Sequence, residues 1–196
     1  MRVEPIRDND QIRRIVERLK EDDSRAGCRR YLLFMSGIYL GRRISDLLPL
    51  RVGEVLGKDR IDVVEQKTGK RITLFIATPL KKAYKQVLTG RDPDEYVFQS
   101  DRVDRITRKP RPISRRTAYD DMKVIAKIGG FPEDYRIGTH TLRKTFGYRY
   151  YQSTRDIAGL MQLFNHTRED VTLIYIGIKT DEVKKTFRKV DSMYDT

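Results

Sequence analysis

The sequence predicts one α+β domain that is mainly α-helical and carries a small antiparallel β-sheet. Three observations support this fold class. Apolar residues recur at helical spacing through the first and last thirds of the chain. Two short strand-like stretches near residues 61–65 and 71–76 are separated by a turn that contains Gly69, which is typical of a β-hairpin. A chain of 196 residues, 38% of them hydrophobic, is long enough to bury one core.

The expected helices begin at capping residues and end near glycines or prolines. We expect helices at 8–21, 25–40, 42–48, 78–89, 114–128, 139–152, 155–164, 167–176 and 180–190. The predicted N-caps are Asp8 or Asn9, Thr78 with Pro79 in the first turn, Ser114, and Thr167 in a capping box with Asp170. Residues 96–98 add a short third strand to the prediction.

Residues 102–116 differ from the rest of the chain because they are strongly basic. They contain seven arginine or lysine residues and one acid, Asp104, and two prolines keep them out of regular structure. The whole chain carries a net charge of +13 and has a pI near 9.9. This excess favours a polyanionic partner, nucleic acid first and a membrane surface second. A solvated flexible loop is the alternative for 102–116.

The sequence also excludes several classes of protein. No apolar run approaches the ~20 residues of a membrane-spanning helix, and the N-terminus lacks the apolar core of a signal peptide. The one cysteine, Cys28, rules out an intramolecular disulfide and a multi-cysteine metal site. No histidines, cysteines and carboxylates have metal-ligand spacing. We therefore expect a cytoplasmic protein with no cofactor and no metal.

Both histidines of the chain lie between Gly138 and Tyr175, which marks this stretch as a candidate site. His140 and Arg143 are three residues apart and would share one face of a helix. A guanidinium group beside an imidazole suits an anionic oxygen. His166 precedes Tyr175 by nine residues, and a tyrosine becomes a nucleophile where cations stabilise its phenolate. A buried histidine at a capped helix start and a core tyrosine are the alternatives at this point.

Four sequence boxes, in register, resemble the catalytic domain of the tyrosine recombinases, also called phage integrases. In chain order the boxes are Gly41-Arg42-Arg43-Ile44-Ser45-Asp46-Leu47, Lys67-Thr68-Gly69-Lys70, Thr139-His140-Thr141-Leu142-Arg143, and Leu163-Phe164-Asn165-His166 with Thr172-Leu173-Ile174-Tyr175. They look like the family's first arginine box, its hairpin lysine, its His-x-x-Arg box and its nucleophile box. One box alone is weak support, but four in the right order and spacing are specific.

The resemblance implies a DNA strand-transfer mechanism. Arg43 and Arg143 would clamp the non-bridging oxygens of the scissile phosphate. Tyr175 would attack phosphorus to form a 3′-phosphotyrosine, and Lys67 would protonate the leaving 5′ oxygen. His140 would assist proton transfer at the nucleophile, and His166 would hydrogen-bond the phosphate. A 5′-hydroxyl from a partner strand would then attack the phosphotyrosine, so that bond energy is conserved without ATP or metal.

Further residues are predicted to support this site or to hold DNA. Asp46 is expected to buttress the arginines, with a helix-cap role as the alternative. The candidate DNA-contacting residues are Arg42, Lys70, Arg102, Arg105, Arg108, Lys109, Arg111, Arg115, Arg116 and Lys144. The expected partners are double-stranded DNA and further copies of the chain, as dimers to tetramers on DNA, with accessory DNA-bending proteins as an additional option.

The sequence departs from the family's pattern in several places. Arg42 stands where an apolar residue is usual and competes with Arg43 for the catalytic role, although the register of the first box favours Arg43. Lys144 stands where many members have histidine, and Asn165 replaces a common glycine. Typical members carry an N-terminal DNA-clamping domain. Here we expect it to be absent, with 1–196 as one catalytic domain.

The last twenty residues, 177–196, are expected to contain a C-terminal helix. This helix either packs on its own domain or is exchanged in trans with a neighbouring subunit.

The favoured function is a site-specific DNA recombinase or integrase. One alternative is a non-catalytic DNA-binding relative that regulates or competes for recombination sites, and another is a topoisomerase-like enzyme that relaxes DNA. The presence of all six candidate catalytic side chains argues against the non-catalytic alternative. These side chains are Arg43, Lys67, His140, Arg143, His166 and Tyr175.

Overall fold

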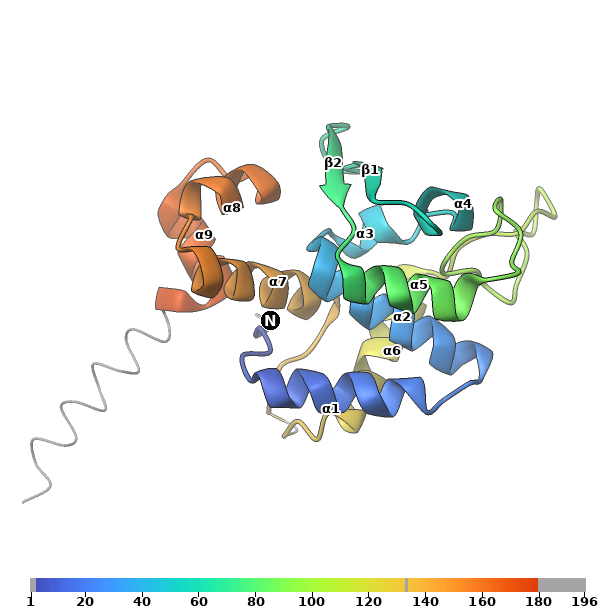
Figure 1. Ribbon diagram of the computed structural model, residues 1–196, viewed down its shortest axis with the longest axis horizontal. Helices are drawn as coiled ribbons and strands as arrows, with labels where there is room; N and C mark the ends of the chain where they lie inside the picture. Colours follow the sequence, from blue (N-terminus) through green and yellow to red (C-terminus); the bar gives the residue numbers. More distant parts are fainter. Residues whose placement is uncertain (1–2, 133, 180–196) are drawn as a thin grey trace, which may run out of the picture.

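The computed structural model describes residues 3–132 and 134–179, and it is mainly helical (Figure 1). The elements in chain order are α1 (Asn9–Lys20), α2 (Arg25–Leu40), α3 (Ile44–Leu47), α4 (Val52–Val55), β1 (Arg60–Val64), β2 (Arg71–Phe75), α5 (Thr78–Leu88), α6 (Arg115–Ile128), α7 (Thr139–Thr154), α8 (Ile157–Phe164) and α9 (Glu169–Ile176). The predicted α+β class with a small antiparallel sheet is therefore confirmed.

Helix α2 is the centre of the main core. It packs against α1, α5, α6 and α7, and its residues from Tyr31 to Ile38 are buried. The helix begins at the N-cap Ser24 and ends at Gly41, whose φ of +61° is the left-handed conformation that favours glycine. A Cβ at Gly41 would come within 2.3 Å of the Phe146 ring, so packing also requires glycine here.

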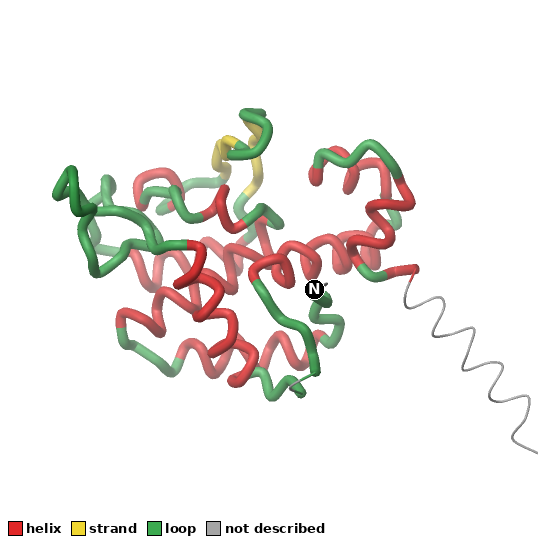
Figure 2. Tube along the Cα trace, turned by 180° about the vertical axis from the view of Figure 1, so that it is seen from behind, coloured by secondary structure: helices red, strands yellow, loops and turns green. Residues whose placement is uncertain are grey.

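The hairpin of β1 and β2 projects from the helical layer, on the same side as α8, in both views (Figures 1 and 2). Its antiparallel register pairs Ile61 with Leu74 and Val63 with Ile72. Ile61 and Val63 point into the core, and Glu65 follows on the same face because strand side chains alternate. Gly69 turns the chain with a φ of +68°.

Helices α8 and α9 form a second, smaller core with the C-terminal half of α7. Its buried members are Leu160, Phe164, Ile176 and Ile178. Gly147 of α7 permits this contact, because a Cβ there would lie 2.7 Å from Ile176 and 2.8 Å from Phe164. Since the first turns of α7 pack in the main core through Leu142, this helix joins the two cores and its N-terminal end lies between them.

Several local predictions were wrong. Ala77, not Thr78, is the N-cap of α5, although the helix keeps its proline in the first turn. Residues 96–98 form no strand, because Tyr96 makes only an isolated bridge to Arg51. The short helix α4 was not predicted, since Val52–Val55 is a single turn with no sequence periodicity. The predicted helix 180–190 lies outside the described residues.

The predicted capping box before α9 is also absent. Arg168 is the N-cap, without a side-chain cap bond, and its guanidinium forms a bidentate pair with Asp170. The acid that would complete the box is therefore engaged with arginine. Within the described ranges, no helix is long and apolar enough to cross a membrane.

Candidate active site

The tyrosine predicted as nucleophile lies inside a cluster of aromatic and cationic side chains. Nδ1 of His140 shares a hydrogen bond of 3.1 Å with the hydroxyl of Tyr175. The rings of His166 and Phe164 meet the Tyr175 ring edge-on, with centroids 5.5 and 5.7 Å away. The ammonium group of Lys144 lies 4.9 Å from the centroid of the same ring. The ring is therefore held on several sides, which fixes the direction of its hydroxyl.

Arg143 is anchored beneath this cluster by backbone carbonyls. Its two terminal nitrogens donate to the carbonyl oxygen of Gly41, at 2.8 Å, and to that of Phe164, at 3.0 Å. Its guanidinium carbon also lies 4.0 Å from the centroid of the Phe164 ring. The side chain is only 2% exposed. Arg143 thus ties the end of α2 to the end of α8 and carries a buried positive charge beside Tyr175.

Glu65 pairs with both arginines of the first box. Its Oε1 lies 3.4 Å from Arg42 and 3.1 Å from Arg43, and its Oε2 accepts a hydrogen bond of 2.8 Å from the Thr68 hydroxyl. The glutamate side chain is fully buried. Sequence reasoning missed this residue. The available signal was its position, because an acid on the inward face of a strand needs a buried cation.

The two arginines of the first box are not equivalent. Arg42 is 0% exposed, and besides Glu65 it donates to the carbonyl oxygen of Leu163. Arg43 is 22% exposed. The direct DNA contact predicted for Arg42 stays a prediction, and the structure shows its guanidinium engaged by Glu65 and by the carbonyl oxygen of Leu163. Arg43 is the more exposed arginine of the first box.

Asp46 connects the first box to the hairpin. Its carboxylate accepts hydrogen bonds from the backbone N–H of Arg43, at 3.3 Å, and of Gln66, at 3.0 Å. The bond to the Arg43 N–H is the helix-cap interaction expected as the alternative role of Asp46. The bond to the Gln66 N–H holds the backbone of the residue before Lys67. Asp46 thus makes the cap contact and also ties the first box to the backbone of the residue before Lys67.

Lys67 is the predicted catalytic residue that lies apart from the others. It is exposed on the hairpin turn, and among residues 3–132 and 134–179 no hydrogen bond or ion pair joins it to the Tyr175 cluster. The other five candidates lie on α7 and α9, at the N-cap of α3 and in the α8–α9 connection, whereas Lys67 lies on the hairpin turn.

His166, in the connection between α8 and α9, is oriented by a hydrogen bond to α9. Its Nδ1 lies 3.0 Å from the hydroxyl of Thr172, which donates to the Arg168 carbonyl oxygen. Asn165 precedes it with a φ of +52°, the left-handed conformation that asparagine tolerates in place of glycine. Asn165 can therefore take the backbone conformation at this turn that glycine takes in many family members.

Burial dominates the electrostatics of the site. It lowers the pKa of His140 and that of His166, and the charges of Arg143 and Arg43 act in the same direction. Both imidazoles are therefore neutral near pH 7, and His140 can accept a proton. Burial raises the pKa of Tyr175, while Arg143 and Arg43 oppose this rise. Burial also lowers the pKa of Arg143 to about 10, which leaves its guanidinium charged at neutral pH.

The predicted DNA-contacting residues separate into two groups by exposure. Lys144 and Arg42 are buried, and the direct contact to DNA predicted for each stays a prediction. The others are exposed: Lys70, Arg102, Arg105, Arg108, Lys109, Arg111, Arg115 and Arg116. Within the described residues, no group of three His, Cys, Asp or Glu side chains could hold a metal ion.

We expect Glu65→Gln to destabilise the fold by about 3 kcal/mol, because the change leaves Arg42 buried without its acid. The free energy of unfolding from urea denaturation measures the effect. Asp62→Asn is the matched control, since Asp62 lies on the exposed face of the same strand and should cost at most ~1 kcal/mol. Equal small losses in both variants would contradict the structural role given to Glu65.

Together, the fold and the site define a domain that presents one tyrosine hydroxyl among arginines and histidines, an arrangement suited to attack on a phosphodiester. The profile of the Phage integrase family matches residues 7–182. The chain belongs to this family. It is 40% identical over 186 residues to "Probable integrase/recombinase YoeC" from Bacillus subtilis (strain 168), covering 95% of this chain and 96% of that protein.

Other relatives are longer proteins. "Tyrosine recombinase XerS" from Streptococcus gordonii is 27% identical, and the match covers 81% of this chain and 43% of XerS. Among solved structures, the XerA recombinase superposes with a TM-score of 0.69 at 22% identity, over 95% of this chain and 63% of XerA. The catalytic domain of bacteriophage HP1 integrase gives a TM-score of 0.56 at 16% identity, over 88% and 86% of the two chains. These similarities confirm the predicted tyrosine recombinase catalytic-domain fold.

Proposed function

We propose that this chain is a site-specific DNA recombinase or integrase that cleaves and rejoins DNA strands through a 3′-phosphotyrosine. The observation that carries the proposal is the hydrogen bond between His140 and the Tyr175 hydroxyl, made beside two arginines. A phenol with an ordinary pKa near 10 needs both a base and nearby positive charge to attack at neutral pH. The site supplies both.

In the cleavage step, the Tyr175 oxygen forms a bond to phosphorus as the bond from phosphorus to the 5′ oxygen breaks. Neutral His140 accepts the phenolic proton at Nδ1, where it already contacts the hydroxyl. Lys67 donates a proton to the leaving 5′ oxygen from the exposed hairpin turn. Attack by a 5′-hydroxyl on the phosphotyrosine reverses these proton transfers and reseals the strand.

The arginines stabilise the charge that develops on the phosphate oxygens. Arg143 is held rigidly by two carbonyls, so its charge is oriented before DNA binds. Arg43 is braced by Glu65 but remains partly exposed, so it can bind a phosphate oxygen directly. Arg42 and Glu65 serve as a buried support for Arg43, and Lys144 fixes the ring of Tyr175.

The proposed partners are double-stranded DNA and further copies of the chain. Similar structures include XerH recombinase in complex with its difH substrate and a lambda integrase tetramer bound to a Holliday junction, with TM-scores of 0.67 and 0.60. The net charge of +13 also favours binding to a polyanion such as DNA. The ordered cluster around Tyr175 favours a catalytic protein over a non-catalytic competitor for sites.

A nicked suicide duplex tests the proposal, because the strand fragment after the cleavage site diffuses away and traps the intermediate. DNA that flanks the gene of this chain is the substrate of choice. We expect a covalent adduct that survives denaturation, with the nucleotide remnant on the peptide containing Tyr175 after digestion and mass spectrometry. An intact duplex should accumulate little adduct, because religation reverses cleavage. Attachment at another residue, or no adduct on DNA that the chain binds, would overturn the proposal.

A further inference from the structure

A braced loop carries an exposed apolar side chain at its tip. This loop, residues 101–111, is named here the basic loop. The carboxylate of Asp104 accepts hydrogen bonds from the backbone N–H of Ile106, at 3.0 Å, and of Thr107, at 2.7 Å. The backbone N–H of Arg108 returns to the Asp104 carbonyl oxygen at 3.0 Å. These bonds close a compact turn and present Ile106 outward, 92% exposed.

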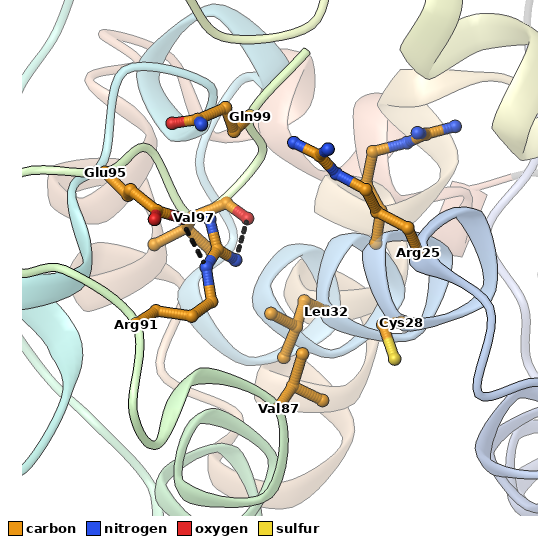
Figure 3. Close-up of a pocket in the computed structure, with 9 residues that line it drawn as sticks. Arg25, Cys28, Leu32, Val87, Arg91, Glu95, Val97 and Gln99 are labelled. Atoms are coloured by element: carbon orange, nitrogen blue, oxygen red, sulfur yellow. Dashed lines mark hydrogen bonds and ion pairs between the residues drawn. The ribbon is translucent and has the colours of Figure 1, made fainter. Parts of the chain in front are cut away.

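The base of the basic loop is fixed to the helical layer. Asp101 forms an ion pair of 2.9 Å with Arg25 of α2. Figure 3 shows the cavity beside this anchor, where Arg91 donates to Glu95 and to the carbonyl oxygen of Val97, at 2.8 and 3.4 Å. The cavity is about 440 Å³. Its arginines hold the chain that leads into the loop, so the loop is positioned before any partner binds.

Positively charged residues lie close to Ile106 in the chain. Arg105 precedes it, and Arg108 and Lys109 follow within three residues, all exposed. Asp104 directs its carboxylate to the N–H groups of Ile106 and Thr107. Figures 1 and 2 show the loop and α8 at opposite ends of the molecule, with the β1–β2 hairpin between them. The loop is therefore separate from the elements that carry the Tyr175 cluster.

This combination fits one class of partner. Arginine and apolar side chains both occur in protein interfaces, so the net charge of the segment decides the class of partner, and an excess of cations favours a polyanion. The minor groove of DNA accepts arginines along its walls, and apolar side chains such as isoleucine wedge between its base steps. Residues 102–116, with seven cations and one acid, complement the phosphates on both sides of such a groove.

We propose that the basic loop inserts Ile106 as a wedge into the minor groove of the duplex arm beside the cleavage site, with Arg105 and Arg108 on the flanking phosphates. The proposal rests on the function proposed above and adds a second DNA contact, away from the scissile phosphate. Because a wedge must unstack one base step, binding should favour arms with a flexible pyrimidine–purine step at that position.

The test uses the full chain and duplexes that it selects from a random-sequence pool. A 2-aminopurine is placed at successive arm positions, because its fluorescence rises when it is unstacked. We expect a rise at one step, which disappears in Ile106→Ala together with about tenfold weaker binding. Arg105→Gln and Arg108→Gln should each weaken binding to all sequences and lower the salt slope by about one.

The control variant is Val124→Ala, which shortens an exposed β-branched side chain on α6, outside the loop. It should change neither the fluorescence nor the affinity. Since Ile106 is almost fully exposed, its truncation removes little packing and the fold should be unaffected. Unchanged binding and fluorescence in Ile106→Ala would overturn the wedge. So would a change confined to self-association without DNA, which would make the tip a contact between copies.

The suicide-duplex assay separates this proposal from the proposed function. Adduct formation without any unstacked step would overturn the wedge and leave the recombinase assignment intact. Unstacking that depends on Ile106, with no adduct at Tyr175, would support the wedge and reject the enzyme.

Discussion

Replacing Tyr175 with phenylalanine is expected to abolish the covalent protein–DNA adduct while DNA binding is retained. The change removes the oxygen that we propose attacks phosphorus, and loss of a nucleophile costs on the order of 10⁶-fold in rate in other enzymes. The phenylalanine ring keeps the edge contacts with His166 and Phe164, so the site stays packed. The hydroxyl's interactions with His140 and Arg143 are lost, and each hydrogen bond contributes about 1 kcal/mol.

Adduct yield on the suicide duplex and affinity on an uncleaved duplex are measured in parallel. Tyr150→Phe is the matched control, because it removes the same atom from a tyrosine that hydrogen-bonds Asp156 away from the site. This control should form adduct normally. If Tyr175→Phe still formed adduct, Tyr175 would not be the nucleophile.

Replacing Lys67 with alanine is expected to slow cleavage of ordinary DNA by about 10²- to 10⁴-fold, the range for loss of a general acid or base. The effect should vanish when sulfur replaces the 5′ bridging oxygen, because a thiolate leaves without a proton. Single-turnover cleavage rates on the two substrates measure this difference. Equal slowing on both substrates would reject the role of general acid.

Lys70→Ala provides the comparison, since Lys70 is exposed on the same turn. As a predicted DNA contact, it should weaken binding and affect both substrates equally. Only a variant that distinguishes the leaving groups reports proton donation. The comparison is informative because both lysines are exposed on the same turn, and only Lys67 is proposed to protonate the leaving oxygen.

Most helices were predictable because their ends carry local signals. Asp8, Ser24 and Ser114 each accept a hydrogen bond from the first turn of the following helix, and Gly41 ends α2 in the left-handed conformation. The failures were where tertiary contacts outweigh such signals. Asp170 could have completed a capping box but pairs with Arg168 instead.

The residue types of the candidate site and their spacings were predictable from the sequence. The contacts that each side chain makes were less predictable. His140, Arg143 and Tyr175 come together because their helices pack around Phe164 and Gly147, contacts that no local pattern encodes. Glu65 escaped prediction for the same reason. An acid at the end of an amphipathic strand looks solvated until its two arginine partners are placed beside it.

The sequence by itself determined the family and the order of the four boxes, and it singled out Tyr175 as the candidate nucleophile, because those depend on residue identity and spacing. Only the tertiary structure decided which of the two neighbouring arginines is exposed. Arg42 is buried and donates hydrogen bonds to Glu65 and to the carbonyl oxygen of Leu163, whereas Arg43 remains partly exposed. Adjacent side chains point in different directions, and their exposure depends on elements packed from more than a hundred residues away. Accessibility is therefore a property of the assembled fold and not of the motif.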